Sequence, residues 1–363
     1  MKILFFSSAL TGGGAERVLT IVANALVDNG HQVYIATDLR YPIAFSIDKR
    51  VQLENYRKKD PKLFGSLQSI RLLSMLRQMR KLTTSIKPDV VVSFQTSMNI
   101  FTLLSLIGKN FPVIVCEHTN VRRKIPMSKL RPIFYPFASA VTVLTKSDYL
   151  YCRNNWRNKN VVYMPNPYIV KELSNNSATR ENVILAVGRV NSWKVKGFDN
   201  LIKCWSTIWN KHKNWKLRIV GKYDDDSLNY LYNIIKQTNC GNVEFLGFRS
   251  DIDELLRTSK VFVLSSRAEG LPMSLLEAMA AGCCCVSYDV VTGPNEIISD
   301  GVDGILVDNQ NLEQLSHSLD EVMTDDNLLN KLAKHAPSAL NRYSLERVMR
   351  RWYLLFSKVT TNN

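Results

Sequence analysis

The sequence predicts two α/β domains in tandem, each a doubly wound parallel sheet, and three observations support this fold class. The chain has 363 residues, which is too many for one ordinary hydrophobic core and about right for two domains. Short apolar runs alternate with stretches of helical periodicity, as they do in repeated strand–helix–strand units. This alternation is interrupted at residues 164–167, a turn-rich segment with the sequence Met-Pro-Asn-Pro, and then begins again.

The first half contains the elements expected of one such domain. Residues 2–8 are an apolar run that leads into a glycine-rich turn, and residues 16–29 carry apolar side chains at the spacing of an amphipathic helix. We therefore expect a strand, a turn and a helix at the start of the chain. Further strands are expected at residues 31–37, 88–94, 111–117 and 140–144, and a further helix at residues 99–108.

The second half repeats the pattern after the polar residues 174–177, which we interpret as a linker. An amphipathic helix is expected over residues 344–356. The predicted organisation is an N-terminal domain at residues 1–170, a second domain at 171–343, and a C-terminal helix within 344–363 that packs back towards the N-terminal domain. Strands of the second domain are expected at residues 183–187, 216–220, 242–246, 261–264 and 283–287.

The composition excludes several classes of protein. Hydrophobic residues make up 45% of the chain and charged residues 22%, so it is neither disordered nor fibrous. The longest unbroken apolar stretches have about eight residues, against the ~20 of a membrane-spanning helix. No small-residue cleavage site follows the first apolar run, which we therefore interpret as a strand and not as a signal peptide. The seven cysteines include the run at 283–285 but no CxxC pair, which indicates buried, reduced thiols in a cytoplasmic protein.

The charge of the chain is distributed unevenly. The net charge is +15, and residues 1–170 hold 24 Lys and Arg against 9 Asp and Glu, whereas residues 171–363 hold 23 of each kind. All of the excess positive charge therefore lies in the first half. Such asymmetry favours a polyanionic partner, which could be nucleic acid, an anionic membrane surface or a phosphorylated substrate. A well-solvated basic surface would give the same numbers.

A glycine-rich turn, Thr-Gly-Gly-Gly-Ala-Glu at residues 11–16, joins the first strand to its helix. Its glycines could bring backbone N–H groups to an anion at the start of the helix, but such a turn also serves purely steric needs. Its spacing departs from the GxGxxG fingerprint of dinucleotide-binding domains, although Asp38 ends the second strand where a ribose-binding acid would lie. A nicotinamide-dependent enzyme is therefore disfavoured.

A set of basic residues follows the first strand of the second domain. Arg189 comes directly after this strand, and Lys194 and Lys196 come just before the next helix. An arginine and a lysine at a strand-to-helix turn could bind a diphosphate. They could equally be surface charges on a loop, and these residues alone do not decide between the two.

Two carboxylates accompany a later strand of the second domain. Glu269 lies on the loop after the strand, and Glu277 lies eight residues further on, in the following helix. Because a carboxylate accepts hydrogen bonds from two neighbouring hydroxyls, this spacing could hold a sugar and a ribose at opposite ends of a diphosphate. Between them, the helix start over residues 270–274 offers free N–H groups to phosphate.

The segment that begins at Glu269, EGLPMSLLEAMAAG, resembles the Glu-x7-Glu motif of family-four retaining glycosyltransferases of the GT-B type. Three further motifs of that family occur in the family's order. They are the GGAE loop at residues 13–16, a strand-terminal histidine at His118, and the GR…KG pair at Arg189 and Lys196. The resemblance extends over residues 11–297 and implies a GT-B fold, in which two Rossmann-like domains face a central cleft.

The resemblance implies a site for a nucleotide sugar. Arg189 and Lys196 would bind the diphosphate and offset the charge of the leaving group, so that neither a metal ion nor another cofactor is needed. Glu269 would contact the sugar, Glu277 would hold the ribose, and His118 would lie over the sugar ring from the other side of the cleft. The implied catalytic residues are His118, Arg189, Lys196 and Glu269, and the implied donor-binding residues are Gly13, Gly14, Arg189, Lys194, Lys196, Glu269, Gly270, Leu271, Pro272, Ser274 and Glu277.

One departure from the family pattern concerns the lysine. Six residues separate Arg189 from Lys196, more than the family usually has, so Lys194 competes with Lys196 for the phosphate. We prefer Lys196 because Gly197 follows it, as in the motif. Trp193 is interpreted as loop packing and not as a platform for a base.

The resemblance places acceptor binding in the N-terminal domain, where all the excess positive charge lies. Residues 66–87 and 121–137 combine basic and apolar side chains, as segments in a membrane interface do, and each charge near an anionic surface adds about 1 kcal/mol. The apolar side chains could instead cover the domain's own core. The basic residues expected at the membrane or acceptor are Arg77, Arg80, Lys81, Arg122, Arg123 and Lys124, and the second segment also includes Lys129 and Arg131.

The resemblance, together with the charge distribution, thus implies a retaining hexosyltransferase that moves a hexose or N-acetylhexosamine from a nucleotide sugar, with UDP preferred, to a lipid-linked saccharide for an O-antigen, capsule or related surface polysaccharide. Its expected location is cytoplasmic and peripheral, at the inner face of the cell membrane, with an anionic membrane surface and no nucleic acid among its partners. One alternative is a nucleotide-sugar epimerase of the same fold. Another is a basic protein that binds nucleic acid or membrane without catalysis, in which Glu269 and Glu277 would have no use.

Overall fold

The computed structural model describes residues 1–57, 68–158, 160–169 and 179–361. The contacts divide the chain into two compact units, Met1–Pro167 with Leu345–Asn363, and Tyr168–Ser344. The C-terminal helix is therefore counted with the first unit, and the second unit begins at Tyr168. The expected linker at residues 174–177 lies outside the described residues.

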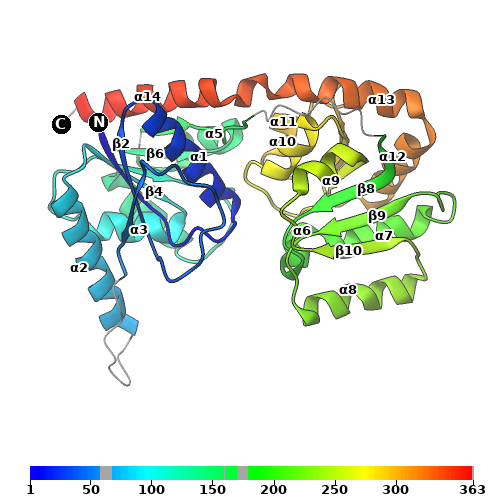
Figure 1. The fold of residues 1–363 in the computed structure, drawn as a ribbon, viewed down its shortest axis with the longest axis horizontal. Helices are drawn as coiled ribbons and strands as arrows, with labels where there is room; N and C mark the ends of the chain where they lie inside the picture. The colour runs from blue at the N-terminus through cyan, green and yellow to red at the C-terminus, as the bar shows by residue number, and fades with distance from the viewer. Residues whose placement is uncertain (58–67, 159, 170–178, 362–363) are drawn as a thin grey trace. The chain divides into compact units, whose positions relative to one another are not determined.

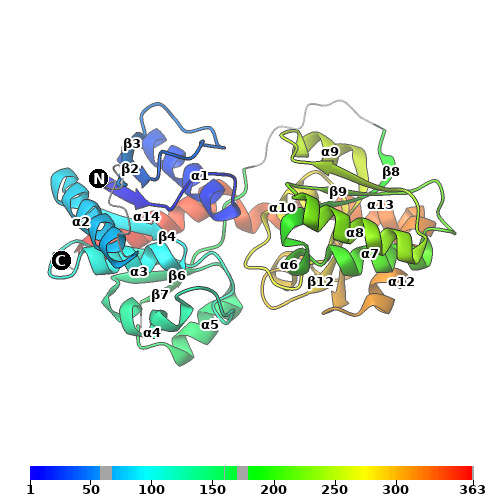
Figure 2. The same cartoon turned by 90° about the horizontal axis from the view of Figure 1, so that it is seen from below.

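The first unit is built on a seven-stranded sheet in the order β3-β2-β1-β4-β5-β6-β7, and all its strand pairs within the described residues are parallel. Helices cover both faces, as Figures 1 and 2 show. The elements are β1 (Lys2–Phe6), α1 (Gly14–Asp28), β2 (Gln32–Thr37), β3 (Gln52–Asn55), α2 (Gln68–Ile86), β4 (Val90–Phe94), α3 (Thr96–Ser105), β5 (Val113–Cys116), α4 (Arg131–Phe134), β6 (Ala140–Val143), α5 (Lys146–Asn155), β7 (Val161–Tyr163) and α14 (Leu345–Thr361), with short 3-10 turns at Ser128–Leu130 and Tyr135–Phe137.

Successive side chains of the central strands point to opposite faces of this sheet, and both faces are covered. Leu4 and Phe6 of β1 are fully buried in a core shared with Met79 of α2 and Ile100 of α3. Successive side chains of a strand point to opposite faces, so the equally buried Phe5 serves the other face. The predicted strands at 2–8, 31–37, 88–94, 111–117 and 140–144 and the two predicted helices are confirmed with small shifts of their ends.

The second unit has a six-stranded parallel sheet in the order β10-β9-β8-β11-β12-β13. The five predicted strands are confirmed, and β13 was not foreseen. The elements are β8 (Glu181–Val187), a 3-10 turn (Val190–Ser192), α6 (Trp193–Lys196), α7 (Phe198–Ile208), β9 (Lys216–Val220), α8 (Asp225–Thr238), β10 (Val243–Gly247), α9 (Ile252–Thr258), β11 (Ser259–Leu264), α10 (Met273–Ala280), β12 (Cys284–Asp289), α11 (Pro294–Ile297), β13 (Ile305–Asp308), α12 (Leu312–Thr324), α13 (Asp326–His335) and a 3-10 segment (Ala336–Tyr343).

The C-terminal helix α14 contacts the first unit through one apolar face. Trp352 and Phe356 are buried on this face, and the guanidinium of Arg351 lies 5.0 Å from the centre of the Tyr163 ring. Together with this helix, which adds four basic residues and one acidic residue, the first unit carries a charge of +18 and the second unit −3. The charge asymmetry is therefore larger than a simple division of the sequence indicates.

Three further properties bear on the sequence predictions. All seven cysteines are free and buried, as expected. No helix in the described parts of the chain combines the length and apolar character needed to cross a membrane. The described residues also contain no group of three or more His, Cys, Asp or Glu side chains that could hold a metal ion.

Candidate active site

The strongest cluster of predicted residues lies where β8 and β11 end in the second unit. These strands are neighbours in the parallel sheet, so the loops that follow them emerge at the same edge, where ligands bind in open α/β sheets. Lys196 Nζ lies 2.8 Å from Glu269 Oε1. Further hydrogen bonds join the loops, from Ser265 Oγ to the Lys196 carbonyl at 2.9 Å and from Arg267, whose N–H donates to the Val195 carbonyl at 2.8 Å and whose Nη1 donates to the Lys194 carbonyl at 2.6 Å.

Two glycines allow this close approach. Gly197 has a φ of +69°, and a Cβ atom there would lie 1.9 Å from the Ser265 carbonyl oxygen, which no side chain could tolerate. At Gly188 a Cβ would lie 3.0 Å from Cδ of Lys196, so the lysine stem packs directly on the glycine. The glycine after the motif lysine thus has a steric reason, which sequence reasoning used only as a pattern.

The structure distinguishes the two competing lysines. Lys194 is exposed, and its ammonium lies 5.3 Å from the centre of the Trp193 ring. Trp193 in turn stacks on Tyr230 of α8 at 4.1 Å, which confirms that the tryptophan packs within the unit. Only Lys196 of the pair reaches Glu269. Its role toward a diphosphate remains a prediction.

Arg189 is exposed directly after β8, and its guanidinium has no hydrogen-bond or ion-pair partner within the described residues. Its donors are therefore available to a ligand. Arg267 at the other loop is engaged instead, because its guanidinium donates to both carboxylate oxygens of Asp199 at 2.7 and 2.9 Å. This ion pair holds the start of α7 against the loop that carries Glu269.

Helix α10 begins immediately after this loop and carries Glu277 as a buried residue. Pro272 precedes the helix and supplies no side-chain cap, so it leaves backbone N–H groups of the first turn, including that of Ser274, without a capping side chain. Leu271 and Pro272 are buried, whereas Gly270 is half-buried, and a Cβ on Gly293 would lie 2.3 Å from the Gly270 carbonyl. The segment after β12 therefore packs directly against the loop that carries Glu269 and Gly270.

The glycine-rich turn of the first unit is occupied by its own chain. The Glu16 carboxylate accepts hydrogen bonds from the N–H groups of Gly12 at 2.9 Å and Gly13 at 3.2 Å. A phosphate would have to displace this carboxylate to reach the same two donors. Gly14 begins α1 and makes no such contact with Glu16 in the structure.

His118 follows β5 in the first unit and is held by ring stacking. Its ring lies 4.6 Å from that of Phe94 at an interplanar angle of 17°, and its Nδ1 atom is buried without a hydrogen-bond partner in the described part of the chain. Burial lowers the pKa of His118 to about 3, and a hydrogen bond with Asn166 opposes this shift in part. The imidazole is therefore neutral at physiological pH.

The residue before His118 takes part in a buried ion pair that sequence reasoning missed. Glu117 and Arg131 are almost completely buried, with Oε2 and Nη2 2.8 Å apart. Thr96 and Tyr135 donate to the same carboxylate, and Arg131 also donates to the Val121 carbonyl at 2.7 Å. The assignment of Arg131 to a solvent-facing basic segment is wrong, because a carboxylate buried at the end of β5 requires a counter-charge.

The other basic residues fall into two groups. Arg77, Lys81 and Lys124 are exposed, and Arg123 is half-buried. Arg80 donates to the Ser105 and Ile107 carbonyls at the end of α3, and Arg122 donates to Ser147 Oγ at 3.0 Å. The segment 121–137, which was expected to resemble a basic amphipathic segment of a membrane interface, consists of short turns around the four-residue α4.

The apolar face of helix α2 covers the core of the first unit along part of its length, as the alternative interpretation expected. Met75 and Met79 are buried, and Leu76, Leu82 and Ile86 pack against the same core. The first turns of the helix differ, because Ile70, Leu72 and Leu73 are 50%, 37% and 49% exposed. Among the described residues of α2, this end presents its apolar side chains to solvent.

Comparisons with known proteins match both halves of the chain. Residues 12–171 match the family model described as Glycosyltransferase Family 4, and residues 171–339 match the model described as Glycosyl transferases group 1. A Campylobacter jejuni protein named as an α-1,4-N-acetyl-D-galactosaminyltransferase that acts on a diphospho-undecaprenol-linked saccharide is 28% identical over 99% of both chains. An amylovoran biosynthesis glycosyltransferase of Erwinia amylovora, AmsD, is 27% identical over 97% of this chain and 98% of its own.

Among solved structures, HepE of Anabaena in complex with UDP and glucose is similar, with a TM-score of 0.78 and 18% identity. The alignment covers 99% of this chain and all of that one. At this identity the similarity concerns the fold.

Proposed function

This chain belongs to the glycosyltransferases that these two family models describe and has the GT-B fold, and we propose that it transfers a hexose or N-acetylhexosamine from a UDP-sugar to a lipid-linked saccharide in the synthesis of a bacterial surface polysaccharide. The observation that carries this proposal is the Lys196–Glu269 pair, which places a cation and a carboxylate side by side at the sheet edge. The acceptor class is supported by the name of the Campylobacter jejuni relative. The UDP donor is supported by the ligand of HepE.

In the proposed reaction the diphosphate lies between two cations. Arg189 brings donors that no described residue engages, and Lys196 brings an ammonium close to Glu269. Both would stabilise the negative charge that develops on the departing diphosphate, so we propose that no metal or other cofactor takes part. Glu269 would accept hydrogen bonds from the sugar and Glu277 from the ribose, while the start of α10 would bind phosphate oxygens.

We propose retention of the anomeric configuration. The bond between the anomeric carbon and the β-phosphate oxygen breaks, and the acceptor hydroxyl bonds to the same face of that carbon. The departing phosphate oxygen takes the hydroxyl proton. His118 is neutral and stacked on Phe94, so its proposed part is to orient the reacting groups and not to supply a proton.

The acceptor would bring the protein to a membrane surface. The first unit holds a charge of +18, and the exposed Ile70, Leu72 and Leu73 at the start of α2 lie next to the basic Arg71 in sequence. Basic and apolar side chains together favour an anionic interface. We therefore propose peripheral binding at the inner face of the cell membrane and no nucleic-acid partner.

The decisive experiment combines a donor screen with product analysis. The full chain is incubated with several UDP-sugars and a set of diphospho-polyprenol saccharides, and products are identified by mass spectrometry and their anomeric configuration by NMR. Transfer with retention, lost in Lys196→Ala, is expected. Release of UDP at the same rate without acceptor would indicate the epimerase alternative, and transfer to no acceptor at all would contradict the proposal.

A further inference from the structure

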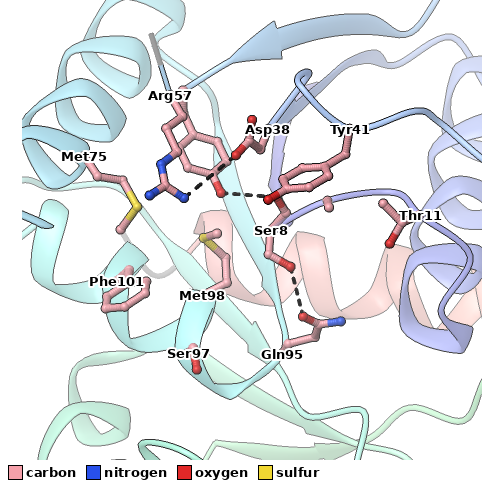
Figure 3. A pocket seen from close by; sticks show the side chains of 12 residues that line it. Ser8, Thr11, Asp38, Tyr41, Arg57, Met75, Gln95, Ser97, Met98 and Phe101 are labelled. Carbon is pink, nitrogen blue, oxygen red and sulfur yellow. Dashed lines mark hydrogen bonds and ion pairs between the residues drawn. The ribbon is translucent and has the colours of Figure 1, made fainter. Parts of the chain in front are cut away.

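A cavity of about 490 Å³ lies wholly within the first unit, where β1, β2 and β4 end. Figure 3 shows its polar side, with Asp38 facing Arg57, and its apolar side, with Met75, Met98 and Phe101. The carboxyl ends of parallel strands are where α/β sheets bind ligands. None of the donor motifs lies in this cavity.

Asp38 is the buried charge of the cavity. Its side chain is 2% exposed, and Arg40 binds it with both arms of the guanidinium, Nε to Oδ1 at 2.8 Å and Nη2 to Oδ2 at 2.7 Å. These hydrogen bonds lower the pKa of Asp38, which keeps the carboxylate ionised. Oδ1 also accepts the Arg40 N–H at 3.2 Å, whereas Oδ2 accepts a single hydrogen bond from the residues that the structure describes. One acceptor position on Oδ2 is therefore open.

Arg57 provides donors next to this open acceptor. Its Nη1 lies 3.8 Å from Asp38 Oδ2, too far for a hydrogen bond, and no described residue accepts a hydrogen bond from its guanidinium. A hydroxyl group can donate to Oδ2 and accept from Arg57 at the same time. A phosphate could accept hydrogen bonds from Arg57 but would be repelled by the Asp38 carboxylate. The pair therefore favours a hydroxyl group over an anion.

The rest of the lining suits a flat, amphipathic ring. Tyr41 is 53% exposed beside the cavity, and Phe101 and Met98 form an apolar wall. Gln95 lines the cavity with a φ of +75°, a backbone conformation that costs a non-glycine residue about 1–3 kcal/mol and that is enriched at functional sites. Its amide oxygen accepts a hydrogen bond from Ser8 Oγ at 3.2 Å, which fixes the amide at the rim.

We propose that this cavity binds the terminal sugar of the acceptor, with one hydroxyl shared between Asp38 and Arg57 and the ring lying against Tyr41. The assignment rests on the proposed function for the identity of the ligand as an acceptor. It adds the site within the first unit and the groups that recognise the sugar.

The test uses full-length variants with a matched control. Arg57→Gln and Tyr41→Ala remove a donor and a ring that hold no core position, and Asp38→Asn removes the charge. Asp48→Asn is the control, because the Arg50 guanidinium binds Asp48 through the same i,i+2 arrangement, Nε to Oδ1 at 2.9 Å and Nη2 to Oδ2 at 2.7 Å, but Asp48 does not line the cavity. We expect an acceptor KM raised at least tenfold in the three cavity variants, with the UDP-sugar KM within twofold of the wild type, and no change in Asp48→Asn.

Saturation-transfer NMR with the soluble acceptor saccharide, and with simple methyl glycosides, gives an independent measure of binding. We expect signals with the wild type that disappear in Arg57→Gln. If Asp38→Asn does not fold, Arg57→Gln and Tyr41→Ala are sufficient to test the assignment. An unchanged acceptor KM and unchanged NMR signals in both Arg57→Gln and Tyr41→Ala would overturn the assignment while leaving the proposed function intact. Saccharide binding that depends on Arg57 in a chain that transfers no sugar would overturn the function and keep the site.

Discussion

Lys196 Nζ and Glu269 Oε1 form an ion pair at 2.8 Å between the loops that follow two neighbouring strands. The side chains are only 23% and 12% exposed, so each limits the orientation of the other before a donor arrives. A diphosphate that binds Lys196 would compete with Glu269 and free its carboxylate for sugar hydroxyls. The pair thus links phosphate binding to sugar binding in the proposed site.

The first prediction separates the two lysines. Lys196→Ala and Glu269→Ala are each expected to lower kcat for transfer by about 10²–10³-fold, because each removes charge stabilisation or positioning at the donor. Lys194→Ala is the matched control, and its kcat is expected to stay within about threefold, since its ammonium lies over Trp193. Initial rates with a UDP-sugar and acceptor measure this, with circular dichroism to verify folding. Equal losses in Lys194→Ala and Lys196→Ala would contradict the assignment.

The second prediction concerns the buried pair of Glu117 and Arg131. Arg131→Ala leaves the Glu117 carboxylate buried without its counter-charge, which is expected to lower the free energy of unfolding by about 3–5 kcal/mol. Lys129→Ala, an exposed position two residues earlier, is expected to change it by less than about 0.5 kcal/mol. Urea denaturation followed by circular dichroism measures both variants. Similar midpoints for the two would show that the buried pair contributes little.

The third prediction follows from the neutral imidazole of His118. Its pKa is about 3 in the folded chain, below the ordinary value of 6.5, so the unfolded chain binds the extra proton. Its contribution to stability is therefore complete above about pH 6.5 and is lost as the pH falls towards 3. Between pH 7 and pH 5 we expect a loss of about 2 kcal/mol.

Denaturation of wild type and His118→Gln at both pH values isolates this contribution. The wild type is expected to lose more stability than the variant on acidification. In the same range the pH profile of kcat/KM should contain no ionisation that His118→Gln removes. Equal pH dependence of stability in the two proteins would show that His118 is protonated normally in the folded chain.

The sequence predicted the helices and strands whose apolar residues follow a regular pattern. Buried central strands such as β4 and β11 are continuous apolar runs, and α1 has a clear apolar stripe. The strands β3, β7 and β13 were missed because they have only three or four residues, most of them half-buried or exposed. So short a run gives no period to recognise.

The limits at the sites have a similar physical origin. Motif order identified Glu269 and Lys196, but their direct contact depends on Gly197 and Gly188, which allow one loop to pack on the other. Arg131 is indistinguishable from its exposed neighbours in a charge pattern, because its partner Glu117 lies fourteen residues away at the end of β5. Asp38 was considered only for a nucleotide, and its pairing with Arg40 and Arg57 becomes visible in three dimensions alone.

The last prediction tests the membrane proposal through the charge asymmetry. The full chain is expected to co-sediment with vesicles that contain anionic lipids at low salt and to dissociate as salt screens the attraction. The combined variant Arg122→Ala, Arg123→Ala, Lys124→Ala should weaken binding at least tenfold, since each cation near the surface contributes about 1 kcal/mol. Lys203→Ala, Lys213→Ala, Lys236→Ala removes three exposed charges from the second unit and should leave binding nearly unchanged. Equal losses in the two triple variants would mean that net charge alone drives adsorption, and no binding at low salt would remove the membrane from the proposal.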